Sequence, residues 1–369
     1  MADRVLTLRE LNRMTLARQL LLDREKLLVP AAVERLAGLQ AQVPNPPYIG
    51  LWTRLRDFRR DDLTRLLERR QIVRATLMRS TLHLMTAEDY LLLRPALQPA
   101  LTRSFQSIAG RRRLEGLDVA RLVAVARTYF EEEPRTFAEL RPVLSALEPD
   151  RDPGILAYAV RTHLPLVQVP SGGAWGYSGN APFTTAESWL GRRLSGSENP
   201  RDLVLRYLAA FGPAMVKDVQ AWSGLVRLKD RIQEFKPELR AFRDERGNEL
   251  LDLPDAPLPP ADTPAPVRFV PDYDNLILSH ADRRRVIADE YRSKVFLSAA
   301  RVRATFLVDG FVRGAWKIER ARGTAALVIE PFETLSREAR LALLEEGERL
   351  VRFAGEDAEA FEVRFAEKV

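Results

Sequence analysis

Apolar residues recur every three or four positions along several segments of the chain, which is the spacing of amphipathic helices. The first stripe consists of Leu8, Leu11, Leu16, Leu20 and Leu21. A second helix is expected to begin at Pro30, a favourable first-turn residue, and to run to Val43, after which three prolines stop it. A third covers about residues 61–70. The β-branched stretch IVRATLMRSTLHLMT (72–86) predicts strands. Three helices followed by a strand pair are typical of a winged helix.

This order of elements recurs twice. Helices are expected over 119–130, over 152–163 and after a capping box formed by Thr136 and Glu139. A Gly-rich stretch at 167–179 suits the wing hairpin. Further helices are expected over 201–212, 213–222 and 227–239, followed by a hairpin with a Gly-Asn turn within 242–253.

The C-terminal part begins after a segment with six prolines, 254–267, which predicts an extended, exposed connector. Residues 303–320 alternate around Asp309-Gly310, a hairpin signal, and residues 336–355 form an amphipathic helix ended by glycine. We therefore expect a mainly helical α+β fold. Its parts would be winged-helix units over 1–115, 116–198 and 199–254, then a linker and β-containing region over 255–369.

The composition excludes several classes of protein. The chain of 369 residues has no cysteine, which excludes disulfide scaffolds and thiol chemistry, and no apolar run of membrane-spanning length. The first ten residues are charged, so we expect a cytoplasmic, nucleoid-associated protein without a secretory signal. Residues 1–120 carry 21 basic and 13 acidic residues, a net +8, whereas the whole chain carries only +6. A basic N-terminal third suits a polyanion partner such as DNA, although a solvated surface explains it equally well.

Familiar enzyme motifs are missing. The sequence has no P-loop, no GxSxG and no HExxH, and its three histidines lie far apart. We expect no metal or organic cofactor.

One chemical feature remains: Gln40 and Gln42 flank Ala41 where a helix is expected to end. On a regular helix their side chains point about 200° apart, so they can share a site only if the helix unwinds. Capping of the last carbonyls is the simpler reading of the spacing alone.

The segments LAGLQAQVPNPPYIGLWTRL, RATLMRSTLHLMTAEDY and VPDYDNLILSHADR resemble the AlkZ-type bacterial DNA glycosylases, and the resemblance covers nearly the whole chain. It implies three tandem winged-helix units around a C-shaped cleft. It also implies hydrolysis of the N-glycosidic bond of N7-alkylated purines, in some relatives unhooking of interstrand crosslinks, and Gln40 and Gln42 as the catalytic pair. The implied partner is double-stranded DNA, with no membrane and a monomer as the expected state.

That chemistry is physically reasonable. N7 alkylation makes guanine a cationic leaving group, so the departing base needs no general acid. A neutral Gln carbonyl can then orient the attacking water or stabilise the developing positive charge on the sugar.

Five further residues are candidate DNA contacts. Arg79 can reach a phosphate or be solvated, and His83 can face the cleft or serve as a structural histidine. The turn of Asp309 and Gly310, followed by Arg313, can wedge into the minor groove or belong to an ordinary sheet hairpin. The stretch from Asp274 to Arg283 suits a buried polar network better than a substrate contact.

Two other functions remain open from the sequence. A non-catalytic winged-helix transcriptional regulator would prefer one DNA sequence and would not need the glutamines. A protein that sequesters a DNA-reactive metabolite would bind that metabolite without DNA.

Overall fold

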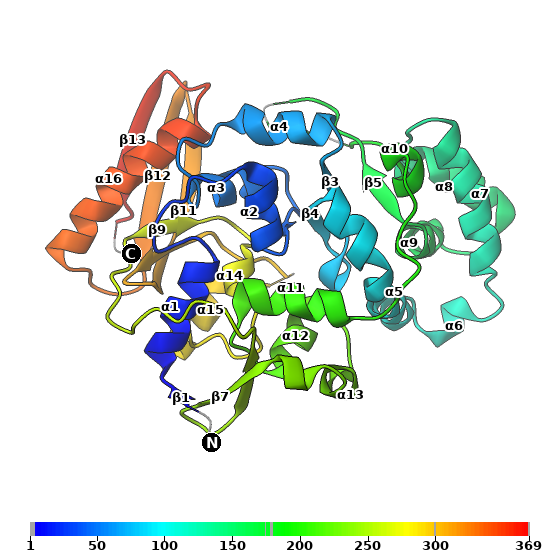
Figure 1. Cartoon of the computed structure of the whole chain (residues 1–369). Coiled ribbons are helices and arrows are strands. Elements are labelled where there is room, and N and C mark those ends of the chain that lie inside the picture. The colour runs from blue at the N-terminus through cyan, green and yellow to red at the C-terminus, as the bar shows by residue number, and fades with distance from the viewer. Residues whose placement is uncertain (1–3, 174, 178–179, 299, 368–369) are drawn as a thin grey trace.

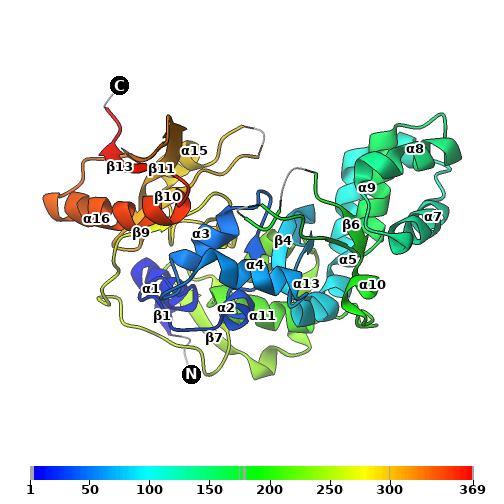
Figure 2. The ribbon, with the colours of Figure 1, turned by 90° about the horizontal axis from the view of Figure 1, so that it is seen from above.

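A computed structural model of the chain describes residues 4–173, 175–177, 180–298 and 300–367. The fold is α+β, with three separate sheets among many helices. One end of the molecule holds a sheet covered by helix α16 (Arg337–Ala354), and the opposite end holds helices α7 (Val119–Glu132) and α8 (Phe137–Leu147) (Figures 1 and 2). Within the described ranges, no helix is long and apolar enough to cross a membrane.

The N-terminal third contains most of the elements that its pattern predicts. In chain order they are β1 (Val5–Leu6), α1 (Leu8–Arg18), α2 (Val29–Arg35), β2 (Leu39–Gln40), α3 (Pro46–Trp52), α4 (Arg60–Glu68), β3 (Ile72–Thr76), a 3-10 turn (Met78–Ser80), β4 (Leu82–Thr86) and α5 (Ala87–Ala109). The strands expected within 72–86 and the helix expected near 61–70 are confirmed. The single helix expected from Pro30 to Val43 is wrong, because α2 ends at Arg35 and a strand follows.

The second segment consists of α6 (Arg111–Leu114), α7, α8, α9 (Pro153–His163), β5 (Leu166–Gln168), β6 (Phe183–Thr185) and α10 (Ala186–Leu190). The capping box of Thr136 and Glu139 starts α8, as expected. The hairpin expected over 167–179 closes later, because β5 pairs with β6, and part of the intervening loop (174, 178–179) lies outside the described residues. Strand β5 also pairs with β3, so the middle sheet, in the order β2-β4-β3-β5-β6, joins the first two expected units.

The third segment holds α11 (Arg201–Phe211), α12 (Val216–Ser223), α13 (Leu228–Gln233), a 3-10 turn (Lys236–Glu238), β7 (Arg240–Asp244) and β8 (Glu249–Asp252). The hairpin with a Gly-Asn turn is confirmed as β7 and β8. Strand β1 pairs in parallel with β7, so the N-terminal strand completes the sheet of the third expected unit.

The proline-rich segment after β8 is fastened to helix α1. Arg9 and Arg13 of that helix donate hydrogen bonds of 2.9 Å and 2.7 Å to the carbonyl oxygens of Ala261 and Thr263. The segment is an exposed connector without helix or strand, as expected, and these two hydrogen bonds fasten it along the surface of α1.

The C-terminal region contains a sheet in the order β13-β12-β11-β10-β9. Its elements are β9 (Arg268–Val270), α14 (Asn275–Leu278), a 3-10 turn (Asp289–Tyr291), α15 (Arg292–Val295), β10 (Thr305–Val308), β11 (Phe311–Ala321), β12 (Thr324–Pro331), α16 and β13 (Ala360–Phe365). The hairpin at Asp309-Gly310 and the helix over 336–355 are confirmed.

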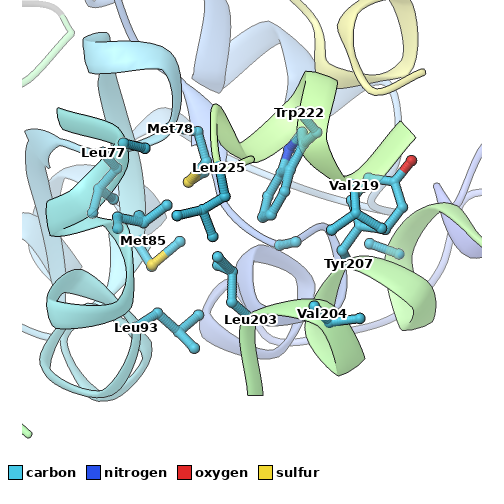
Figure 3. Close-up of a cluster of buried hydrophobic side chains, with 14 of the residues drawn as sticks. Leu77, Met78, Met85, Leu93, Leu203, Val204, Tyr207, Val219, Trp222 and Leu225 are labelled. Carbon is cyan, nitrogen blue, oxygen red and sulfur yellow. The ribbon is translucent and has the colours of Figure 1, made fainter. Parts of the chain in front are cut away.

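A large apolar cluster joins the β3–β4 hairpin to the third segment (Figure 3). Leu77 and Met78, from the tip of that hairpin, are fully buried in one cluster with Trp222 of α12 and Leu203 of α11. The residues at this tip therefore occupy fixed positions against α12.

Candidate active site

The Gln-Ala-Gln motif lies on the edge strand of the middle sheet. Gln40 is paired with His83 in the β2–β4 ladder, and the backbone N–H of Ala41 donates a 2.7 Å hydrogen bond to the carbonyl of Leu82. Gln40 and Ala41 thus continue the pairing with β4, and Gln42 lies at a bend directly after them. This corrects the expectation that the motif ends a helix.

Helix α2 stops early because of a left-handed cap. The N–H of Gly38 bonds to the carbonyl of Val33 at 2.9 Å, and Ala37 and Gly38 both have positive φ, 53° and 83°. This is the hydrogen-bond pattern of a Schellman cap. A Cβ at Gly38 would lie 2.8 Å from the carbonyl oxygen of Leu84, so the close approach to β4 requires glycine. Because the helix ends before the motif, the separation of about 200° expected on a regular helix does not apply to the two glutamines.

The side chain of Gln40 is held by Arg79. The Nη2 of Arg79 donates a 2.6 Å hydrogen bond to Oε1 of Gln40, and Gln40 is only 7% exposed. A guanidinium has no acceptor, so the atom of the amide that faces it must be the oxygen. The orientation of the Gln40 amide is therefore fixed, with its carbonyl toward Arg79.

Gln42 is the exposed member of the pair. Its Oε1 accepts a 3.3 Å hydrogen bond from the backbone N–H of Leu82, which is long for such a bond. Within the described part of the chain, no hydrogen bond from the Nε2 of either glutamine is formed. Gln42 thus has an accessible amide with spare capacity for a water or a substrate atom.

The backbone of the motif is held by Arg74 of β3. Arg74 donates to the carbonyl oxygens of Ala41, at 2.9 Å and 2.7 Å, and of Gln42, at 3.3 Å, and also to Oε1 of Gln168. Its guanidinium lies 4.9 Å from the ring centre of Tyr177, and burial lowers the pKa of Arg74. Arg74 was not among the site residues predicted from the sequence. A charged residue inside the buried strand IVRAT was the available signal.

His83 is a buried neutral histidine. It is completely buried, and burial, together with the charge of Arg79, lowers the pKa of His83 to about 3. Its Nδ1 lies 3.1 Å from the carbonyl oxygen of Thr81 and must donate to it, which leaves Nε2 as an unprotonated acceptor. Among the described residues this Nε2 has no partner. The buried ring does not present itself to a phosphate in this conformation.

The Asp309-Gly310 turn packs against helix α1. Asp309 pairs with Arg9 at 2.6 Å and also with Arg13, and the carbonyl of Gly310 accepts a 2.8 Å hydrogen bond from Asn12. Arg313 forms a 3.2 Å ion pair with Glu333. The structure therefore places this turn in contact with α1, and a role of Asp309, Gly310 and Arg313 at the minor groove stays a prediction.

The C-terminal stretch that includes Asp274 forms a buried polar network, the more favoured of the two sequence-based interpretations. Asp274 makes hydrogen bonds of 2.8 Å and 2.9 Å to the buried guanidinium of Arg54, and Asn275 donates to the carbonyl of Gly38 at 2.9 Å. His280 is bonded to Ser279 and to the carbonyl of Phe211. The network supports the cap that precedes the glutamines.

A groove is lined in part by Asn45, which follows Gln42 by three residues in the sequence. Its volume is about 480 Å³, and its lining includes the aromatic Trp175, the basic residues Arg60, Lys317 and Arg320, and the carboxylates of Asp272 and Asp357. The guanidinium of Arg60 lies 4.0 Å from the ring centre of Trp175. Basic and aromatic groups together suit a nucleic-acid strand.

Three comparisons with known proteins agree over most of the chain. The model of the family described as "DNA glycosylase AlkZ-like" matches residues 33–353. A curated protein from Streptomyces sahachiroi, "Interstrand DNA cross-link repair glycosylase", is 24% identical over 92% of this chain and 94% of its own length. The solved structure of "Streptomyces sahachiroi DNA glycosylase AlkZ" superimposes with a TM-score of 0.80 at 22% identity, covering 98% of this chain and all of that one. The chain belongs to the AlkZ-like DNA glycosylase family.

Proposed function

We propose that this protein is a monofunctional DNA glycosylase that releases N7-alkylated purines from duplex DNA, including purines joined in interstrand crosslinks. The observation that supports it best is the pair of neutral amides, Gln40 and Gln42, held by arginines and backbone N–H groups. Supporting it further, the similar Streptomyces protein is named as a cross-link repair glycosylase.

The proposed reaction is a hydrolysis at C1′ of the deoxyribose. The C1′–N9 bond breaks and its electron pair moves onto the cationic purine, which leaves as a neutral base. A water oxygen then bonds to C1′, and its proton passes to solvent. Because the base already carries the positive charge, the site needs no acid to protonate it.

Each glutamine has its own part in this proposal. Gln42 is exposed and its carbonyl is weakly held, so it orients the attacking water. Gln40 is buried and its carbonyl oxygen is held by Arg79, so its NH₂ group is left to donate a hydrogen bond to an oxygen atom of the water or the substrate. A carboxylate would orient the water and stabilise the developing positive charge more strongly, as in glycoside hydrolases, but the cationic leaving group makes the carbonyl of Gln42 sufficient.

The finer architecture is part of the same proposal. Three winged-helix units, with the boundaries expected from the sequence, would arrange the middle sheet and the groove beside Asn45 along one side of a C-shaped cleft. An open cleft suits a crosslinked purine, because a base joined to both strands cannot be flipped into a closed pocket.

A base-release assay tests the function. The purified protein is incubated with a duplex that carries one N7-methylguanine, and abasic sites are then cleaved with alkali; a nitrogen-mustard crosslinked duplex is treated in parallel. We expect strand cleavage by the wild type and a loss of about 100-fold or more in Gln42→Ala. Tight binding to both duplexes without release would contradict the proposal and favour the regulator.

A further inference from the structure

The turn that carries Arg79 is backbone-strained. Arg79 and Ser80 both have positive φ, 54° and 59°, and they are the central residues of a turn closed by a 3.1 Å hydrogen bond from Thr81 N–H to the carbonyl of Met78. Turns of this kind favour Asn-Gly, because this left-handed backbone conformation disfavours other side chains. The sequence thus keeps an arginine where the backbone disfavours it.

The surroundings hold this turn in place. Met78, beside Arg79, is completely buried in the cluster shown in Figure 3, and Leu77 and Trp222 are buried with it. The backbone of Arg79 also lies against Gly224, where a Cβ would be 3.7 Å from the Arg79 Cα. Packing of the hairpin tip on α12 therefore fixes the conformation of Arg79.

The guanidinium of Arg79 donates hydrogen bonds to two neutral oxygens. Its Nη1 donates a 2.6 Å hydrogen bond to the carbonyl of Trp222, in the last turn of α12, and its Nη2 donates to Gln40. In the described ranges, no carboxylate lies within ion-pair distance of it. A helix C-terminus carries a partial negative charge, which stabilises a guanidinium without neutralising it. Because these donors are directed at the two oxygens, we expect the side chain to hold Gln40 and not to bind a phosphate.

We propose that Arg79 is a positioning residue of the active site, which fixes the amide of Gln40 with its carbonyl inward and its NH₂ group toward the open side. This role replaces the phosphate contact considered from the sequence. The expected effect of Arg79 on the reaction rate rests on the proposed function. The contact between Arg79 and Gln40 can be tested without measuring activity.

The contact is tested by NMR of protein labelled with ¹⁵N-glutamine. The side-chain amide signal of Gln40 is identified by its disappearance in Gln40→Ala. The test variant is Arg79→Asn, because asparagine tolerates the left-handed turn while it removes the guanidinium. The control is Arg103→Ala, because Arg103 donates to the carbonyl of Gly224 at the same helix end but does not touch Gln40. We expect the Gln40 signal to shift in Arg79→Asn and to stay in place in Arg103→Ala. An unchanged signal in Arg79→Asn would overturn the proposal.

The kinetic consequence is tested by single-turnover release of N7-methylguanine at saturating protein. We expect Arg79→Asn to lower the rate on the order of 100-fold, as misplacement of a catalytic group does, with duplex affinity and its salt dependence unchanged. In a Gln40→Ala background the same substitution should change the rate by no more than about twofold, because the two residues act as one unit.

The outcomes separate the two proposals. A weaker duplex affinity with a smaller salt slope and an unchanged rate would assign Arg79 to a phosphate and overturn the positioning role. Absence of base release by the wild type would instead refute the proposed function, and the NMR comparison would still decide whether Arg79 orients Gln40.

Discussion

Two arginines hold the glutamines that we propose as the catalytic pair. Arg74 holds the motif by its backbone and Arg79 holds Gln40 by its side chain, and both donate to neutral oxygens. His83, beside them in β4, is neutral because it is buried near Arg79. None of these three neighbours is a carboxylic acid, which agrees with the proposed release of a base that needs no general acid.

The buried His83 makes stability depend on pH. Its pKa is about 3 in the folded protein, against an ordinary value of 6.5. Between these values the unfolded chain takes up a proton that the folded protein does not. The free energy of unfolding should therefore fall as the pH decreases below about 6.5, by up to about 1.4 kcal/mol per pH unit.

Urea unfolding of the wild type and His83→Gln at pH 7.5 and pH 5.5 measures this effect. We expect the wild type to lose about 1 kcal/mol more than the variant over this range. The variant should keep some pH dependence, because burial also lowers the pKa of His280. Equal losses in the two proteins would show that His83 does not remain neutral.

Elements with a local signal could be predicted from the sequence. Helices α7 and α16 and the turn at Asp309-Gly310 follow from periodicity, capping residues and turn chemistry within a few positions. Strand β2 could not be predicted, because apolar residues on both sides of Gly38 continue the helical pattern, and only pairing with β4 makes the segment extended. The motif was found by resemblance to a family, whereas its strand conformation and its arginine contacts depend on partners distant in sequence.

Substitution of Gly38 tests whether the site depends on the change from helix α2 to strand β2. In Gly38→Ala the new Cβ would meet the carbonyl oxygen of Leu84 at 2.8 Å, and the left-handed conformation alone costs about 1–2 kcal/mol. The matched control is Gly247→Ala, with φ of +76° but no heavy atom within 4 Å of the new Cβ. We expect Gly38→Ala to lose at least about 2 kcal/mol more in chemical denaturation than the control, and to lose base release as β2 shifts. Equal losses would mean that β2 does not depend on this close approach.

In the molecule as a whole, the observed sheets cross the boundaries expected from the repeated order of elements. Strand β1 joins the sheet of β7, and β5 joins that of β3. Buried arginines add further links: Arg18 pairs with Asp252 at 2.6 Å, and Arg54 pairs with Asp274 at 2.8 Å. No short-range pattern in the sequence encodes such pairs, because their partners lie more than 200 residues away.

The pair of Arg54 and Asp274 should be essential for assembly of the site. Asp274→Ala leaves a guanidinium that is only 1% exposed without its anion, which we expect to cost about 3–5 kcal/mol of folding free energy. Asp357→Asn is the control, because the carboxylate of Asp357 pairs with Arg320 at 2.6 Å but is 70% exposed. Thermal unfolding should show a large fall in Tm for the first variant and little change for the second. Similar shifts in both would contradict a structural role for the buried pair.

The most direct measurement of the central claim compares two duplexes that are identical except for one base, N7-methylguanine or uracil. Base release by the wild type is followed under single-turnover conditions, with Gln42→Ala beside it. We predict rapid release of the cationic N7-methylguanine, no detectable release of uracil, and loss of the first activity in the variant. Release of uracil at a comparable rate, or undiminished release of N7-methylguanine by Gln42→Ala, would contradict the account of a neutral amide site that acts on purines already carrying a positive charge.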